Sequence, residues 1–233
     1  MAPPSCSALR KALPITGGAA ALSLLPSIAA AHSSAPGMAG FYQGVLHPFL
    51  SPAQLLALLP LGILAGLQDK KAVSASWLAF AVGSALGLLF AGLGGILDAM
   101  VMPLLLLALA SGVLLSIGKP LPRLFIALLA GSTGLVIGMA VLPDPGLWRD
   151  RLITSIGSYA GVNLLLIFLC SATGLLLDRW KMPWIRIALR IAGSWCVAIA
   201  FLMLALNIQG SFKKKAAAEL LPPPLQSHPV DPA

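Results

Sequence analysis

Polar residues recur at helical spacing near the start of a long apolar run, in the stretch HPFLSPAQ. His47, Ser51 and Gln54 are separated by four and then three residues, so on a continuous helix they would share one face. That face would present an imidazole nitrogen, a hydroxyl and an amide oxygen, which are donors that can bind a metal ion. Because polar side chains at membrane depth cost free energy and often mark function, this spacing predicts coordination of a cation.

The same stretch also has a purely structural interpretation. Ser51, Pro52 and Gln54 fit a capping box, with Ser51 as N-cap, Pro52 as the first helical residue and the Gln54 side chain reaching back. His47 precedes Pro48, which disfavours helical geometry at His47. Capping would explain Ser51 and Gln54, and it would leave His47 unexplained.

Two further residues could supply metal ligands. Asp98 lies between two apolar runs, either as a polar turn residue at the outer interface or as a carboxylate near an outer opening. His32 follows three alanines, at which a signal peptidase could cut. After such cleavage the amine and imidazole of His32 could chelate nickel or copper; the alternative is that an arbitrary residue occupies this position.

A catalytic centre is not predicted. Apart from His47, no histidine lies between residues 33 and 227, so no intramembrane Ser–His pair can form without it. No glycine-rich loop has the pattern of a nucleotide site. We therefore expect neither an enzyme nor a resident cofactor.

The elements that position these residues follow from the composition. The 233 residues are 58% hydrophobic and 9% charged, whereas soluble domains carry about 25% charged residues. This predicts an all-α, polytopic integral membrane protein in a lipid bilayer, with about six helices near the ~20 residues needed to span it. The net charge of +8 does not indicate nucleic-acid binding, because the basic residues lie between apolar runs. The expected helices are 48–68, 72–96, 100–117, 121–142, 152–177 and 185–208.

Three regions are predicted along the chain. Residues 1–31 have a basic start and an apolar stretch, as a cleaved signal peptide has, although an uncleaved first helix is the alternative. Residues 32–210 form the six-helix transmembrane domain, and residues 211–233 form a disordered, Pro-rich tail. Export of the mature N-terminus would place the protein in the inner membrane of a bacterium, with that terminus outside.

Basic residues support this orientation. The loops expected inside hold seven Lys and Arg and those expected outside hold two, in agreement with the positive-inside rule. The tail segment SFKKK adds three outside if there are six helices. Either this late cluster has little influence on topology or one helix is miscounted.

Small and polar residues predict how the helices pack. Glycines four residues apart allow close approach of helix backbones. A polar stripe on the fifth run, formed by Ser155, Tyr159 and Asn163, is expected to bond across to a neighbouring helix. The glycine pairs are Gly62/Gly66, Gly83/Gly87, Gly134/Gly138 and Gly157/Gly161.

Four segments of the sequence have a recognisable order: the predicted signal ending in Ala and His, then GFYQGVLHPF, LLALLPLGILAGLQ and RIAGSWCVAIAFLMLAL. Together they resemble the HupE/UreJ family of small bacterial membrane proteins. The resemblance implies a nickel or cobalt permease associated with hydrogenase and urease genes. Of the family motif His-Pro-x-x-Gly-x-Asp-His, His47 and Pro48 match, while Ser51, Ala53 and Gln54 replace the glycine, the aspartate and the second histidine.

Other departures from the family affect the expected ligands. The family's histidine-rich middle helix corresponds here to LLAGSTGLVIG, which has no histidine, and Asp98 lies near the family's acidic position. An amide and a methyl group bind nickel less well than an imidazole and a carboxylate do. The sequence therefore resembles a divergent branch of the family.

The leading functional prediction is a permease or accessory protein for nickel- or cobalt-type uptake. In this hypothesis His32 captures the ion, His47 passes it on, and Asp98 and Gln54 supply oxygen ligands. A non-transporting scaffold or assembly factor, with a second copy or another membrane protein as partner, is one alternative. Transport of another small solute is the other.

Overall fold

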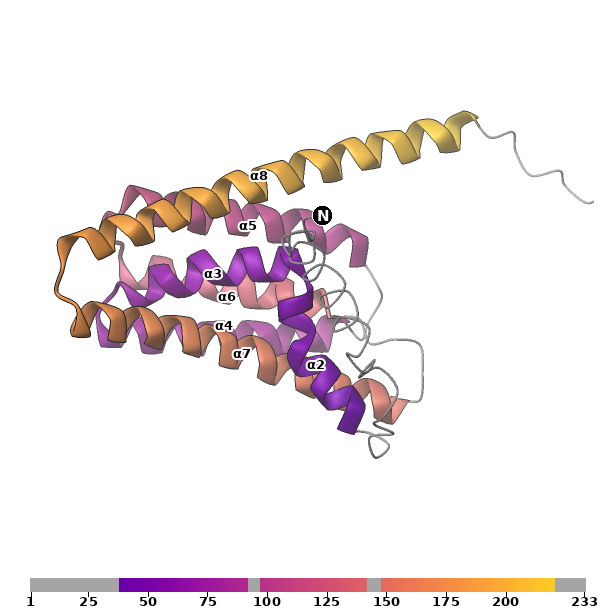
Figure 1. Cartoon of the computed structure of the whole chain (residues 1–233). Helices are drawn as coiled ribbons and strands as arrows, with labels where there is room; N and C mark the ends of the chain where they lie inside the picture. Colours follow the sequence, from indigo (N-terminus) through magenta and orange to yellow (C-terminus); the bar gives the residue numbers. More distant parts are fainter. Residues whose placement is uncertain (1–37, 92–96, 142–147, 221–233) are drawn as a thin grey trace, which may run out of the picture. The chain divides into compact units, whose positions relative to one another are not determined.

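The described part of the chain is entirely helical. The computed structural model describes residues 38–91, 97–141 and 148–220, which form seven α-helices and no strand (Figure 1). This confirms the all-α prediction. The helices are α2 (Met38–Leu50), α3 (Pro52–Gly66), α4 (Lys70–Ala91), α5 (Leu97–Ile117), α6 (Arg123–Met139), α7 (Trp148–Arg179) and α8 (Pro183–Leu220).

Helices α3 to α8 correspond to the six predicted apolar runs, whereas α2 was not predicted as a helix. Fewer helices than predicted are long enough to span a bilayer on their own. Within the described ranges four helices, α4, α5, α7 and α8, are long and apolar enough to cross a membrane. The pair α2 and α3, bent by 71° at its break, can make a fifth span, and α6 is a shorter apolar helix. The chain is therefore a multi-pass membrane protein.

The helical tail is a correction to the predicted domain boundaries. Helix α8 continues to Leu220, so the first ten residues of the predicted tail are helical. The segment KKKAAAEL explains this, because Lys, Ala, Glu and Leu all have high helix propensity. The predicted signal peptide, 1–31, and the rest of the tail, 221–233, lie outside the described residues.

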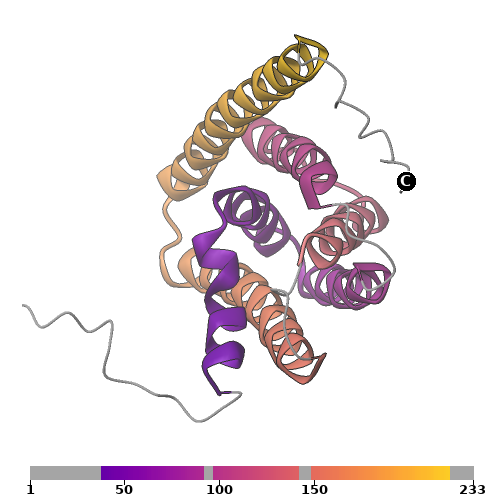
Figure 2. The ribbon, with the colours of Figure 1, turned by 90° about the vertical axis from the view of Figure 1, so that its right-hand side faces the viewer.

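Helix α3 is the central element of the bundle. It packs against each of the six other described helices and lies near the middle when the bundle is viewed end-on (Figure 2). Its buried residues lie all around the helix, which is the pattern of a helix surrounded by protein. By contrast, 11% of the apolar window of α8 is buried, so most of that helix is left to face lipid.

Glycines bring several pairs of parallel helices into close contact. A Cβ on Gly134 of α6 would meet Phe80 and Ser84 of α4, and one on Gly138 would meet Ser84 and Gly87. Because the residue numbers rise together on both helices, α4 and α6 run in the same direction. The predicted close packing at the glycine pairs is confirmed here.

Helices α2 and α7 form the second parallel pair. A Cβ on Gly157 of α7 would meet Phe41 of α2, and one on Gly161 would meet Val45. This contact holds α2, and with it the HPFLSPAQ stretch, against the N-terminal half of α7. The fold thus brings His47 close to the level of the polar stripe.

Candidate functional site

The break between α2 and α3 is where the chain changes direction inside the apolar region. Ser51 has extended geometry, with φ −97° and ψ 103°, between two helical segments. The backbone N–H of Ser51 donates to the carbonyl oxygen of His47 at 3.0 Å, which closes the last turn of α2. His47 and Pro48 are both inside α2, so the predicted non-helical geometry at His47 is wrong.

Packing accounts for this difference. A proline inside a helix removes one hydrogen bond and its ring crowds the carbonyl four residues earlier, here that of Gly44. The backbone of Gly44 lies against Thr154 and Ser158 of α7, so close that a Cβ would be 2.8 Å from the Ser158 nitrogen. Contact with α7 therefore offsets the local preference of the residue before proline.

The capping box is correct in position and wrong in its bonds. Ser51 is the N-cap of α3 and Pro52 occupies the first turn, as predicted. The Ser51 side chain makes no capping hydrogen bond. The Gln54 side chain is instead buried, with 2% of its surface exposed, and its Oε1 has no hydrogen-bond partner among the described residues.

Asn163 of α7 is the second buried amide with a free oxygen. Its Nδ2 donates to the Ser84 hydroxyl of α4 at 3.3 Å and to the Tyr159 carbonyl oxygen at 2.9 Å. The Tyr159 hydroxyl donates to the carbonyl oxygen of Ala81 at 3.4 Å. The predicted bonding of the polar stripe to a neighbouring helix is confirmed, whereas Asn163 Oδ1 has no described partner.

Other buried polar side chains differ from these two amides. The hydroxyls of Ser76, Ser111 and Thr133 each donate to a carbonyl oxygen of their own helix, at 2.8 to 2.9 Å. Such bonds satisfy a polar group without requiring any neighbour. An unpartnered buried oxygen costs about 1–3 kcal/mol, so the two amide oxygens are the groups that need an explanation.

The four predicted metal ligands are brought together only in part. His47 is half-buried in the last turn of α2, and Gln54 is in the first turn of α3. Because the helix bends between them, they do not share one continuous helix face. Asp98 lies in the first turn of α5, at the same end of the bundle as the start of α3 (Figure 1), and its side chain is not described. His32 lies outside the described residues.

The donor set determines what the site can do chemically. In the described ranges no three His, Cys, Asp or Glu side chains lie together as a metal-binding group. The donors present are one imidazole and two amide oxygens, which are weaker ligands for a divalent ion than carboxylate or thiolate. Such donors fit brief coordination of a partly hydrated cation better than permanent binding.

The sequence did not predict that the Asn163 side-chain oxygen is left without a described partner. The residue was noted as part of a packing stripe, and an amide deep in an apolar run was the available signal. Which of its atoms would lack a partner depends on where α4 lies, and no spacing in the sequence gives that.

Comparison with known proteins identifies one family. The family model described as HupE / UreJ protein matches residues 20–204. No curated protein and no solved structure matches the chain. The match covers the α2–α3 break, the polar stripe and most of α8.

Proposed function

Because this chain belongs to the HupE / UreJ family, we propose that it is a permease or accessory protein for uptake of a nickel- or cobalt-type ion. It would act in the inner membrane of a bacterium, with the mature N-terminus outside. The observation that carries the proposal is the buried Gln54 oxygen, which has no partner among the described residues. It belongs to α3, the helix that packs against all the other described helices. A cation passing through the bundle would complete the coordination of that oxygen.

The weakness of the donors suits this role. An ion must be bound strongly enough to leave water and weakly enough to leave the site. In the proposal His47 hands the ion across the Ser51 break to Gln54, and Asn163 offers a second oxygen from α7. His32 and Asp98 are the proposed ligands nearer the outer end, where the ion is first captured.

Flux in reconstituted vesicles tests the proposal. The full chain is placed in liposomes with an entrapped metal-sensitive dye, and nickel and cobalt uptake is measured. We expect His47→Ala and Gln54→Leu to lower uptake at least about tenfold, because loss of even a supporting group at a metal site costs about 10–100-fold. Gln43→Leu is the matched control, since Gln43 is an exposed glutamine on α2.

Two results would redirect the assignment. Absence of metal flux and of metal binding, with a stable partner recovered by crosslinking in the membrane, would select the scaffold or assembly factor. Competition of uptake by a small organic solute would select transport of that solute. Equal uptake by the Gln54→Leu and Gln43→Leu variants would remove Gln54 from the path.

A further inference from the structure

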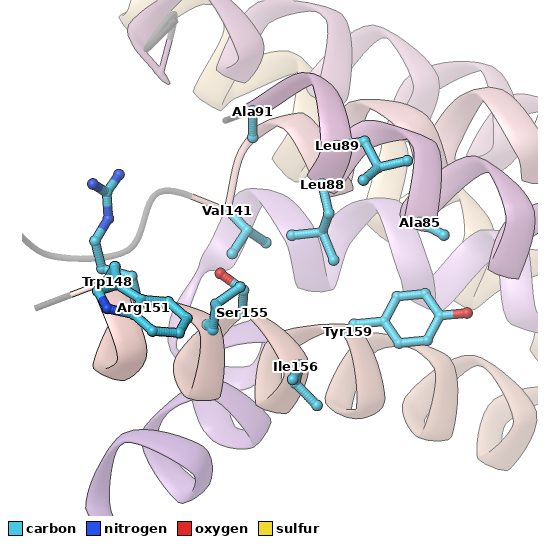
Figure 3. A pocket seen from close by; sticks show the side chains of 11 residues that line it. Ala85, Leu88, Leu89, Ala91, Val141, Trp148, Arg151, Ser155, Ile156 and Tyr159 are labelled. Atoms are coloured by element: carbon cyan, nitrogen blue, oxygen red, sulfur yellow. The ribbon is translucent and has the colours of Figure 1, made fainter. Parts of the chain in front are cut away.

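A pocket between α4 and α7 is separate from the amide oxygens of the proposed metal path. It has a volume of about 650 Å³ and is lined by α4, by Val141 after α6, and by the first three turns of α7. Trp148 and Arg151 lie at one end of it, Ser155 and Ile156 lie between, and Tyr159 lies at the other end (Figure 3). The volume is in the range of pockets that bury a small organic molecule.

The pocket is open toward lipid. Leu89 is 71% exposed and Ile156 is 59% exposed, although both line the pocket. In a multi-pass membrane protein such exposed apolar side chains face acyl chains. A ligand could therefore enter sideways from the bilayer.

The length of the pocket along α7 matches the thickness of one leaflet of the hydrocarbon core. From Trp148 to Tyr159 the pocket follows eleven residues of α7, or about 17 Å at 1.5 Å per residue. Half of the ~30 Å hydrocarbon core is about 15 Å. Since Trp148 begins α7 beside charged residues, its end of the pocket is at the level of the lipid headgroups.

The charge that the described lining residues supply at this end comes from Arg151. Among those described residues, Arg151 and Tyr159 are the ionisable ones. Asp150 is not a lining residue, and its carbonyl oxygen faces Gly40 of α2. No ion pair to Arg151 is present in the part of the chain that the structure describes. A guanidinium at the headgroup level can bind phosphate with two parallel hydrogen bonds.

We propose that this pocket binds one anionic phospholipid, with its phosphate on Arg151 and an acyl chain between α4 and α7. The positive charge at the headgroup end favours a lipid of net negative charge over a zwitterionic one. The apolar walls, which include Leu88, Leu89 and Ile156, hold the chain. Bound there, the lipid would fill the gap between the two helix pairs on this side of the bundle.

Photolabelling tests the proposal. The full chain in nanodiscs of equal phosphatidylglycerol and phosphatidylcholine is labelled with either lipid carrying a diazirine in its acyl chain, and labelled peptides are mapped. We expect residues 85–91 and 152–159 to be labelled about fivefold more by the anionic probe, since one basic side chain near an anionic headgroup favours it by about that factor. Arg151→Gln should bring the ratio close to one.

Three variants separate a specific site from general contact with lipid. Arg149→Gln is the matched control, because Arg149 is in the same turn and does not line the pocket. Ile156→Trp should lower labelling by filling the pocket while Arg151 is kept, and Arg151→Lys should preserve part of the preference. Equal labelling by both probes in the unmodified chain, or an equal loss in the Arg149 and Arg151 variants, would overturn the proposal.

Discussion

The α4–α6 interface and the α2–α3 break use polar and small residues in opposite ways. At the first, glycines bring two backbones together, and the Thr133 hydroxyl bonds to a carbonyl of its own helix. At the second, Ser51 is extended and its side chain makes no capping hydrogen bond, and the buried Gln54 oxygen has no hydrogen-bond partner among the described residues. The first region satisfies its polar group within one helix, whereas the second leaves a buried oxygen without a described partner, and it is this oxygen that the proposed function assigns to an ion.

The largest expected effect comes from adding a side chain at the α4–α6 interface. In Gly134→Leu, the new Cβ would be 3.1 Å from the Ser84 nitrogen and closer still to the Phe80 carbonyl oxygen, so backbone must move. Overpacking costs roughly 1–3 kcal/mol and sometimes more, and we expect the upper end because the contacts are backbone atoms. Thermal unfolding in detergent measures the loss.

The control for this change is Gly174→Leu. Apart from its chain neighbours and the nearby backbone of its own helix, no atom lies within 4 Å of the position that a Cβ on Gly174 would take. The same substitution should therefore be tolerated there. If both variants unfolded at the same temperature as the unmodified chain, close packing of α4 on α6 would not be what stabilises this pair.

The second-largest expected effect comes from adding metal ligands at the α2–α3 break. Ala53→Asp with Gln54→His supplies the carboxylate and imidazole that the resemblance places at these positions. Ala53 is 8% exposed, so the new carboxylate should destabilise the protein without metal. Nickel at about 100 times its dissociation constant should restore about 2.7 kcal/mol, measured as a rise in unfolding temperature.

A single Gln43→His variant is the control for this gain of binding. It adds an imidazole at an exposed position of α2, away from the buried start of α3. Nickel should change its unfolding temperature little. An equal rise in both variants would mean that any added histidine binds the ion, and that the break is not special.

The sequence predicted the architecture because the membrane leaves few choices. Apolar runs of nearly bilayer length must be helices, and the glycine pairs could be identified as contacts before their partners were known. The bend at Ser51 was also indicated, by a serine followed by proline. What could not be predicted was that α2 would stay helical through Pro48, because this depends on the contact of Gly44 with α7.

The candidate site was predictable in its residues and not in its bonds. Gln54 was identified by its spacing from His47, yet the local pattern favoured a cap that the structure does not make. Burial of Gln54 follows from the central place of α3, a property of the whole bundle. The ligand roles of all four predicted residues, His32, His47, Gln54 and Asp98, stay predictions.

Gln54→Leu should be the more stable of the two amide-to-leucine variants. Gln54→Leu removes a buried oxygen without a described partner, so the free energy of unfolding should stay level or rise by up to about 1 kcal/mol. Asn163→Leu also removes such an oxygen, but it loses the bonds from Nδ2 to Ser84 of α4 and to the Tyr159 carbonyl oxygen, and an interhelical bond of this kind is worth about 0.6 kcal/mol. Thermal unfolding of both variants in one detergent compares them; a marked loss of stability in Gln54→Leu would show that its oxygen is satisfied in the folded protein.

The smallest effect is expected at the α4–α6 interface itself. Thr133→Val keeps the shape of a side chain that is 1% exposed and removes a hydroxyl bonded 2.8 Å from the Leu129 carbonyl oxygen of the same helix. That carbonyl keeps its backbone partner in the helix, so the free energy of unfolding should change by less than about 0.5 kcal/mol. Metal uptake should also be unchanged. A loss of uptake in a stably folded Thr133→Val variant would place the ion's path between α4 and α6, and would reverse the roles assigned to the two regions.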